Sequence, residues 1–152
     1  MPTHKDEPLY LEDVEVGDTW EGPARTITET DIVNFACLTG DFNPLHVDHE
    51  FAKGTLFGKP IAHGLLGVSY MAGLGSHSPY MRTAAFVKIR DWTFLRPIFV
   101  GDTIHVTTEV LAKDVRGRGR RGLVTWKRQL VNQTGVVVQE GITETLVEIR
   151  GE

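Results

Sequence analysis

Two side chains of complementary acid–base character, Asp41 and His46, lie five residues apart in the sequence Gly-Asp-Phe-Asn-Pro-Leu-His. Pro44 disfavours a helical conformation for Asn43, so the segment between them is expected to be extended rather than regular helix. A loop stiffened in this way can bring a carboxylate and an imidazole over one cavity. Because the two groups differ in proton affinity, they could share one water molecule and add it to a double bond by acid–base chemistry.

A second feature is the sequence Ala-His-Gly at residues 62–64, at the start of an apolar stretch. A helix is expected to begin there, and the first amides of a helix have no partner within it. Gly64 lacks a side chain, so a ligand oxygen could approach its amide closely. Such an amide suits the oxygen of a carbonyl whose α-carbon gains negative charge during a reaction.

Each feature also has a purely structural interpretation. Asp41 could cap a turn, and His46 could be an ordinary loop histidine with its hydrogen bonds satisfied. Gly64 could be needed only for close packing of a helix on a sheet. Taken one at a time, the three residues therefore leave a structural role open.

A helix is predicted to end just before the Asp41 loop. Thr28 is a suitable N-cap, Asp31 completes a capping box, and an apolar stripe at helical spacing follows. Gly40 is well placed to end this helix. Residues 40–60 are expected to be mostly loop, with one helical turn at residues 48–53, because Pro and Gly interrupt anything longer.

The stretch from residue 62 to about residue 75 is apolar on every side, which predicts a helix that is buried all round. One or two short strands are expected within residues 9–27. Gly141 is interpreted as a bulge or bend in the last of four longer strands. Those four are predicted at residues 84–95, 103–112, 122–132 and 136–149. The predicted fold class is α+β, with a long antiparallel sheet curled around one buried helix.

The chain has 152 residues, of which 41% are hydrophobic, a size and composition that suit one domain with a real core. Residues 1–8 are interpreted as a polar tail and residues 9–152 as the domain. Cys37 is the only cysteine, which excludes an internal disulfide and favours a reducing compartment, the cytoplasm. The first residues lack the apolar core of a signal peptide, and no apolar run reaches the about 20 residues that span a bilayer.

The net charge is −4, but the charges are unevenly distributed along the chain. Residues 113–128 form a basic cluster with seven Lys or Arg residues and one Asp. We interpret this cluster as the solvated tip of a hairpin. The alternative is a phosphate-binding surface for a ligand that carries a nucleotide. A nucleic acid is disfavoured as a partner, because the whole chain is acidic and the cluster has no interleaved aromatic residues.

Taken together, the motifs resemble those of the MaoC-like dehydratases and (R)-specific enoyl-CoA hydratases. The resemblance extends from about Gly17 to Ile149. It implies a hot-dog fold, in which a curved antiparallel sheet wraps around a central helix. It also implies a homodimer whose sheets join edge to edge, with each active site near the subunit interface. The motifs that carry it are Thr-Gly-Asp-Phe-Asn-Pro-Leu-His at residues 39–46, Ala52, Ala-His-Gly at residues 62–64, Phe-Leu-Arg-Pro at residues 94–97 and Gly-Asp-Thr at residues 101–103.

Residue by residue, Asp41 and His46 match the catalytic pair of the family, and Gly64 matches its oxyanion amide. Asn43 and Pro44 match the positions that shape the catalytic loop. The implied reaction is the reversible hydration of a trans-2-enoyl thioester of CoA or acyl carrier protein to the (R)-3-hydroxyacyl thioester. No cofactor or metal is expected, and the sequence leaves open which of Asp41 and His46 is the base.

The acyl chain itself is poorly defined by the sequence. Some short-chain hydratases of the family carry a serine where this chain has Ala72, so the length of the acyl chain stays open. The residues expected to contact substrate are Phe42, Asn43, Phe57, His63, Leu65 and Ser69, with Leu45, Val68 and Tyr70 as further candidates for the acyl-binding surface.

Other functions fit the sequence less well. Hot-dog thioesterases usually place an acid on or near the central helix, whereas residues 51–90 contain no Asp or Glu. A non-catalytic acyl-CoA binding module would not need both Asp41 and His46. The histidines and acids near residue 46 do not have the spacing of a known zinc motif, and Cys37 fits a small buried side chain better than a nucleophile.

Overall fold

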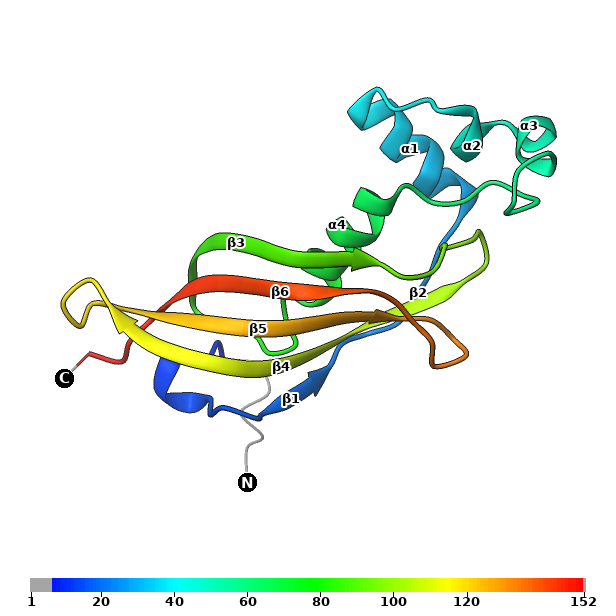
Figure 1. Cartoon of the computed structure of the whole chain (residues 1–152). Helices are drawn as coiled ribbons and strands as arrows, with labels where there is room; N and C mark the ends of the chain where they lie inside the picture. The colour runs from blue at the N-terminus through cyan, green and yellow to red at the C-terminus, as the bar shows by residue number, and fades with distance from the viewer. Residues whose placement is uncertain (1–6, 152) are drawn as a thin grey trace.

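The computed structural model describes residues 7–151, which form one antiparallel sheet, a helix packed on it and a group of short helices at one end (Figure 1). The sheet order is β1-β4-β5-β6-β3, and β2 also pairs with β4. The four predicted long strands are confirmed, and the second of them continues further than expected. The strands are β1 (Thr19–Glu21), β2 (Arg25–Thr26), β3 (Thr83–Phe94), β4 (Thr103–Arg116), β5 (Arg121–Val131) and β6 (Val137–Glu148).

The helices are η1 (Leu11–Asp13), a 3-10 turn, and α1 (Glu29–Thr39), α2 (Pro44–Val47), α3 (His49–Lys53) and α4 (Gly64–Leu74). Helix α1 begins as predicted: Thr28 accepts from the Asp31 amide, and the Asp31 carboxylate accepts from the Thr28 amide. It ends at Gly40, whose φ of 80° lies in the left-handed region that favours glycine.

The segment at residues 40–60 is more helical than predicted. Asn43 is non-helical as predicted, with φ −52° and ψ 128°, but Pro44 itself occupies the first position of α2, where a missing N–H has no intrahelical partner to lose. His46 therefore lies on a short helix rather than in a loop. Helices α1, α2 and α3 together project beyond one end of the sheet, beside the start of α4 (Figure 1).

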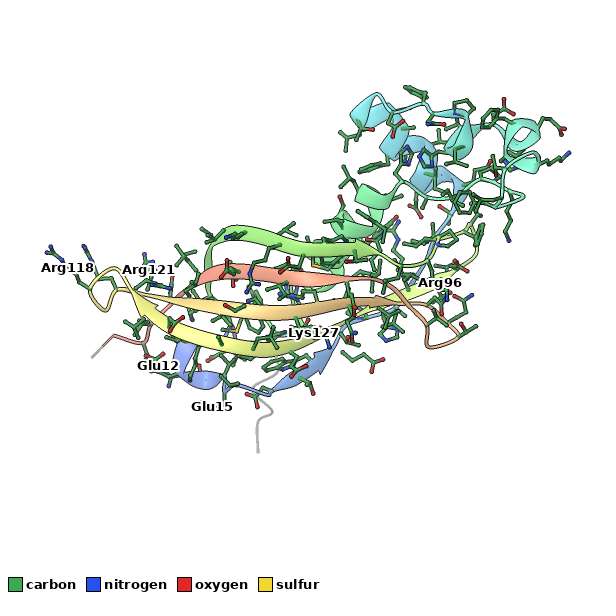
Figure 2. All side chains as sticks on the ribbon, in the orientation of Figure 1. Glu12, Glu15, Arg96, Arg118, Arg121 and Lys127 are labelled. Carbon is green, nitrogen blue, oxygen red and sulfur yellow. The ribbon has the colours of Figure 1, made fainter. Side chains whose placement is uncertain are left out.

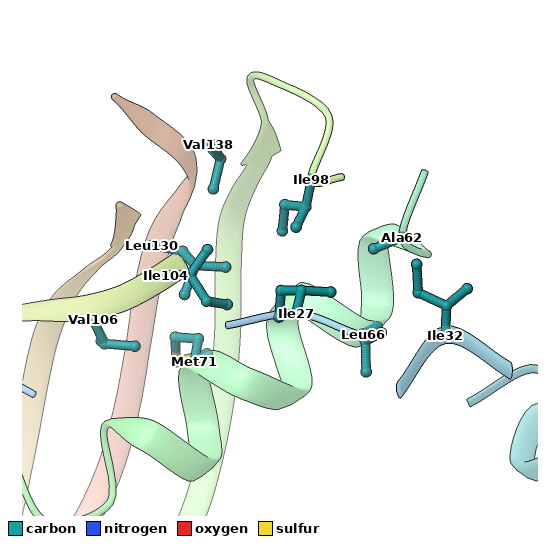
Figure 3. Packing of buried hydrophobic residues seen from close by; sticks show 10 residues of the cluster. All are labelled: Ile27, Ile32, Ala62, Leu66, Met71, Ile98, Ile104, Val106, Leu130 and Val138. Atoms are coloured by element: carbon teal, nitrogen blue, oxygen red, sulfur yellow. The ribbon is translucent and has the colours of Figure 1, made fainter. Parts of the chain in front are cut away.

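Helix α4 packs against the sheet through Leu66, Gly67 and Met71. Burial of a side chain such as Met71 contributes about 1.5–3 kcal/mol to stability. The core between helix and sheet, seen in Figure 3, consists of Ile27, Ile32, Ala62, Leu66, Met71, Ile98, Ile104, Val106, Leu130 and Val138.

The prediction that this apolar helix is buried all round is wrong for the single chain. Leu65 is 65% exposed, and Ser69 and Ala72 on the same helix are also exposed. The sheet covers only one side of α4, and nothing else in the described part of the chain covers the opposite side. Helix α4 thus has more apolar surface than a single copy of the chain buries.

Gly141 has a different role from the predicted bulge in its own strand. β6 pairs with β5 through Gly141 without interruption, whereas β3 gains one extra residue between Arg90 and Thr93. A Cβ at Gly141 would lie 2.5 Å from the ring of Trp92, which belongs to this bulge. The glycine therefore makes room for a bulge in the neighbouring strand.

The basic cluster is divided by the structure. Arg118 and Arg121 lie at the tip of the β4–β5 hairpin, at the opposite end of the sheet from α1–α3 (Figure 2). Lys113 pairs with Glu15 at 3.0 Å. Arg128, grouped with the hairpin tip on sequence grounds, is only 8% exposed, so its assignment to a solvated surface is wrong. It occupies a core position in the alternation of β5.

Of the predicted tail at residues 1–8, only Glu7 and Pro8 fall within the described residues. Leu9 already belongs to the fold, since its amide donates to the Tyr80 carbonyl at 2.8 Å. Among residues 7–151, no helix combines the length and the apolar character that crossing a membrane requires.

Candidate active site

The turn between α1 and α2 fixes the position of Asp41. The Asn43 amide donates to Asp41 Oδ1 at 3.2 Å, and Asn43 Oδ1 accepts from the Leu45 amide at 3.0 Å. Asn43 is thereby the N-cap of α2, with Pro44 next to it. These contacts give Asn43 and Pro44 the loop-shaping role that the resemblance implied.

His46 is held by the segment that leads into α4. Its Nδ1 lies 2.7 Å from the carbonyl oxygen of Ile61. A carbonyl oxygen can only accept a hydrogen bond, so Nδ1 carries the proton. In the neutral ring Nε2 then has a free lone pair, which is the state of a general base.

His63, the N-cap residue of α4, is 3% exposed and packs against both members of the pair. Its ring stacks on that of His46, with centroids 3.9 Å apart, and meets the Phe35 ring edge-on at 5.1 Å. Its Nε2 donates to the backbone carbonyl of Asp41 at 2.9 Å. His63 Nδ1 is buried and has no partner among the described residues.

Asp41, His46 and His63 converge on one point. Each offers one nitrogen or oxygen atom, and these atoms all lie within 4.8 Å of one another. The Asp41 side chain remains 54% exposed, with Oδ2 4.0 Å from His63 Nε2. The predicted proximity of Asp41 and His46 is thus present, and a buried third residue supports it.

Gly64 brings the first amide of α4 to the same place. Within residues 7–151 no side chain or loop carbonyl accepts a hydrogen bond from this amide. A Cβ at Gly64 would lie 2.8 Å from the Phe94 ring, so close packing also requires a glycine here. The position therefore combines the two interpretations that the sequence left open, a free amide and tight packing.

Two cavities flank the start of α4, and both are lined by His46 and Gly64. The smaller has a volume of about 140 Å³ and is also lined by Asp41, His63 and Leu65. The larger, of about 330 Å³, has mainly apolar walls and one cation, Arg96. Its remaining walls are formed by Phe57, Ile61, Ala62, Phe94, Leu95, Pro97, Ile98 and Gln139.

The predicted substrate contacts are distributed unevenly around this site. His63 and Leu65 line the smaller cavity, and Phe57 lines the larger one. Phe42 is 56% exposed and Ser69 donates to the Leu65 carbonyl at 2.9 Å; neither lines these two cavities. Their contact with substrate stays a prediction.

Gln139 is the clearest site residue that sequence reasoning missed. It is 2% exposed, its Nε2 donates to the Gly64 carbonyl at 3.1 Å, and its Oε1 accepts from Trp92 Nε1 at 3.2 Å. It ties the first turn of α4 to β6. A polar residue at a core position in the alternation of β6 was the available signal.

A charged group anchors α1 to the sheet and to α4. Arg25 pairs with Asp31 at 2.6 Å, and its guanidinium carbon lies 4.8 Å from the centroid of the Tyr70 ring. Burial, together with the Asp31 charge, raises the pKa of Tyr70 to about 12. Burial alone would raise the pKa of Asp31, but hydrogen bonds from Thr28 and Tyr70 and the Arg25 charge hold it below its usual value.

The same geometry raises the question of a metal. Asp41, His46 and His63 are close enough to offer three ligands. One nitrogen of each ring, however, is already bonded to a backbone carbonyl, and His63 Nδ1 is fully buried. The expectation that no metal is needed stays a prediction, which activity after treatment with a chelator would test.

Comparison with known proteins gives a consistent result. The family described as "MaoC like domain" matches residues 13–132. The (R)-specific enoyl-CoA hydratase of Rhodospirillum rubrum is 34% identical over 148 residues, covering 93% of this chain and 94% of that protein. The MaoC protein of Klebsiella aerogenes is 37% identical over 107 residues, which cover 70% of this chain but only 32% of the longer relative.

Solved structures agree with the sequence comparison. A structure from Archaeoglobus described as a monoamine oxidase regulatory protein superposes with a TM-score of 0.87 at 43% identity, covering 95% of this chain and 97% of that one. A Mycobacterium tuberculosis protein with a double hot-dog fold gives a TM-score of 0.83 at 21% identity, covering 95% of this chain and 46% of that one. The predicted hot-dog architecture is confirmed.

Proposed function

Because the chain belongs to the MaoC-like family, we propose that it adds water reversibly to the double bond of a trans-2-enoyl thioester, giving the (R)-3-hydroxyacyl thioester. As a member of this family it is a hydro-lyase. The observation that carries the proposal is the convergence of Asp41 and His46 beside the free amide of Gly64. A base, an orienting carboxylate and an oxyanion donor are the groups that this reaction needs.

His46 is the base in this proposal. Its Nδ1 is committed to the Ile61 carbonyl, so Nε2 accepts a proton from the water as the water oxygen bonds to C3 of the acyl chain. The same proton is then returned to C2, which completes the addition of one water. The Asp41 carboxylate accepts a hydrogen bond from the other hydrogen of the water and so orients its lone pair towards C3.

Negative charge builds up on the thioester oxygen during the attack. The Gly64 amide would donate a hydrogen bond to that oxygen, assisted by the positive end of the α4 dipole. Gln139 holds the Gly64 carbonyl from β6 and so fixes the direction of the peptide at the start of α4. The protein supplies these groups from its own side chains and backbone, and the mechanism needs no cofactor.

A homodimer is part of the proposal. β3 is an edge strand whose residues are almost all exposed, including large apolar side chains on both of its faces. Such an edge invites pairing with another strand. Phe86, Val87 and Ile89 are each 42–50% exposed, and the uncovered face of α4 adds Leu65. Antiparallel pairing of two β3 strands across a two-fold axis would bury both surfaces.

The proposals for the carrier and the compartment each rest on one residue. Arg96 on the wall of the larger cavity suits a phosphate of CoA, and an acyl carrier protein also presents a phosphate. Cys37 is exposed, so the prediction that it is buried is wrong, but a lone free thiol still suits the reducing environment of the cytoplasm. Neither a nucleic acid nor a membrane is needed for the proposed reaction.

The proposal is tested with trans-2-enoyl-CoAs of increasing chain length, by following the loss of absorbance of the conjugated double bond. Chiral analysis of the product should give the (R) enantiomer. Release of free CoA thiol without loss of the double bond would instead identify a thioesterase. Binding of enoyl-CoA without either change would identify a binding module.

A further inference from the structure

A buried arginine lies at the end of α4 that is remote from the catalytic cluster. Arg128 on β5 is 8% exposed, and its side chain reaches under the last turn of α4. Its Nε donates to Thr143 Oγ1 at 3.4 Å, and its Nη1 donates to Thr108 Oγ1 at 2.8 Å and to the Gly75 carbonyl at 3.3 Å. The guanidinium carbon lies 5.2 Å from the centroid of the Trp126 ring.

All these partners are neutral. A guanidinium has five N–H donors, and the described residues provide acceptors for Nε and Nη1 but none for Nη2. No described carboxylate lies within 4.0 Å of the Arg128 nitrogens. Burial lowers the pKa of Arg128 to about 10. A buried cation of this kind is unfavourable until an anion joins it.

Arg128 lines a cavity of about 510 Å³. Glu148 is the only acid on its walls, and this carboxylate lies 4.0 Å from a second cation, Arg82. A carboxylate entering the cavity would therefore meet Nη2 of Arg128, the nitrogen without a partner among the described residues, with no competing acid beside it. The aliphatic part of a molecule that carries this carboxylate would contact the apolar walls formed by Met71, Ala72 and Phe86.

The position of the cavity relates it to the proposed reaction. Thr83 and Phe86, at the start of β3, line the cavity, whereas Phe94, at the end of the same strand, lies against Gly64. When two β3 strands pair antiparallel, the start of one strand lies beside the end of the other. In the proposed dimer the Arg128 cavity of one copy is thus next to the catalytic cluster of its partner.

We propose that Arg128 binds a carboxylate at the far end of the acyl chain, which makes ω-carboxy-trans-2-enoyl thioesters the preferred substrates. This inference rests on the proposed hydratase function and its dimer. The competing explanation is that Arg128 only caps the carbonyl at the end of α4. A structural cap predicts no preference for a charge on the substrate.

The test compares kcat/KM for pairs of enoyl-CoAs of equal length, one ending in a methyl group and the other in a carboxylate. At the chain length that reaches the cavity, the native enzyme should favour the carboxylate by about tenfold or more. Arg128→Met should abolish this preference by raising KM for the carboxylate-ended substrate. A short enoyl-CoA should be hydrated as before. Lys127→Met, which removes a charge facing another cavity, should keep the preference. Equal use of both substrates by the native enzyme at every length would overturn the proposal.

A second measurement separates this inference from the proposed function. If no enoyl-CoA is hydrated, the hydratase proposal has failed, and the subsite is tested alone by thermal shift with straight-chain dicarboxylates against sodium chloride of equal ionic strength. Stabilisation of the native chain that Arg128→Met loses supports a carboxylate site, and no stabilisation overturns it. Equal protection by acetate would indicate a site for free anions and overturn the assignment to an acyl chain. Should Arg128→Met fail to fold, Arg128→Lys replaces it, because it keeps the charge but loses the planar guanidinium and its free Nη2 donors.

Discussion

The imidazole rings of His46 and His63 stack with their centroids 3.9 Å apart and their planes inclined by 26°. The same buried His63 donates through Nε2 to the backbone carbonyl of Asp41. One residue at the start of α4 therefore positions both proposed catalytic side chains. Its burial of 97% leaves the substrate little access to its ring, so we regard it as a positioning residue.

His63→Phe tests this role, because it keeps an aromatic ring against His46 and removes both ring nitrogens, of which Nε2 is the donor to Asp41 and Nδ1 has no partner among the described residues. Misplacement of a catalytic group by a fraction of an ångström to one ångström typically costs about 10- to 100-fold in rate. We expect kcat to fall within that range while KM changes little. A raised KM with unchanged kcat would instead indicate that His63 contacts the substrate, as the sequence predicted.

Asp31 should make the stability of the protein depend on pH. Its pKa is lowered in the folded chain, so the stability it contributes is present above the unfolded value of about 4 and is lost as pH falls through the folded value. At neutral pH, Asp31→Asn should be less stable than the native chain by about 1–2 kcal/mol. The difference in free energy of unfolding between the two proteins should shrink at about pH 3 and below. Urea unfolding measures it.

Thr28→Ala is the matched control, since it removes the other half of the capping box without removing a charge. Its cost should shrink less at acidic pH than that of Asp31→Asn, because Thr28→Ala keeps the Asp31 charge, the Arg25 pair and the backbone hydrogen bond from Thr28 and loses only the side-chain one. A gap between Asp31→Asn and the native chain that does not change with pH would show that the Arg25 pair and the cap contribute nothing through ionisation.

Arg96 should bind a phosphate of the carrier. It is the one cation on the walls of the larger cavity, within the part of the chain that the structure describes. Arg96→Ala should raise KM for an enoyl-CoA by about tenfold and leave kcat nearly unchanged, because the phosphates are remote from the reacting atoms. The matching enoyl-pantetheine, which lacks the nucleotide, should show a much smaller change. Equal effects on both substrates would mean that Arg96 acts on the acyl part or on folding.

Mixed dimers test whether the two halves of a site come from different copies. Chains carrying Asp41→Asn and chains carrying Arg128→Met are co-expressed with different tags and the mixed species is purified. In the proposed dimer, one of its two sites combines a native Asp41 with a native Arg128. The preference for ω-carboxy substrates should therefore reappear, measured as kcat/KM.

The control is the Arg128→Met homodimer, which has no such site. Absence of the preference in the mixed species would place both groups of a site in the same copy. Light scattering gives an independent check, because a fully active species of one 16.9 kDa chain would contradict the dimer itself.

The sequence predicted best what depends on local chemistry. The cap at Thr28 and the stop at Gly40 depend on a few neighbouring residues, and both are present. The effect of Pro44 on Asn43 is present as well, whereas the helix that Pro44 itself begins was not predicted, although its fixed φ suits a first helical position. Arg128 could not be placed, since a basic residue near a hairpin gives no sign that tertiary packing buries it.

In the candidate site, too, local features were predicted and long-range contacts were not. The Asp41–His46 pair was predicted from its motif, whereas the proton-bearing nitrogen of His46 depends on Ile61, fifteen residues away. Gln139 lies seventy-five residues from the Gly64 carbonyl that it binds. Contacts of that range are set by the sheet topology, which hydrophobic patterning indicates only in outline.

The central claim is that Asp41 and His46 act as a unit on one water molecule. Asp41→Asn and His46→Gln keep the size of each side chain and part of its hydrogen bonding, so circular dichroism should be unchanged. Each should lower kcat for enoyl-CoA hydration by about 10²–10⁴-fold.

The most direct measurement is kcat of the double variant beside the two single variants. The account predicts that the double variant is scarcely slower than the slower single one, because groups that act as a unit are not additive. It would be contradicted by a folded Asp41→Asn that keeps more than about a tenth of native kcat, or by losses in the two single variants that simply multiply.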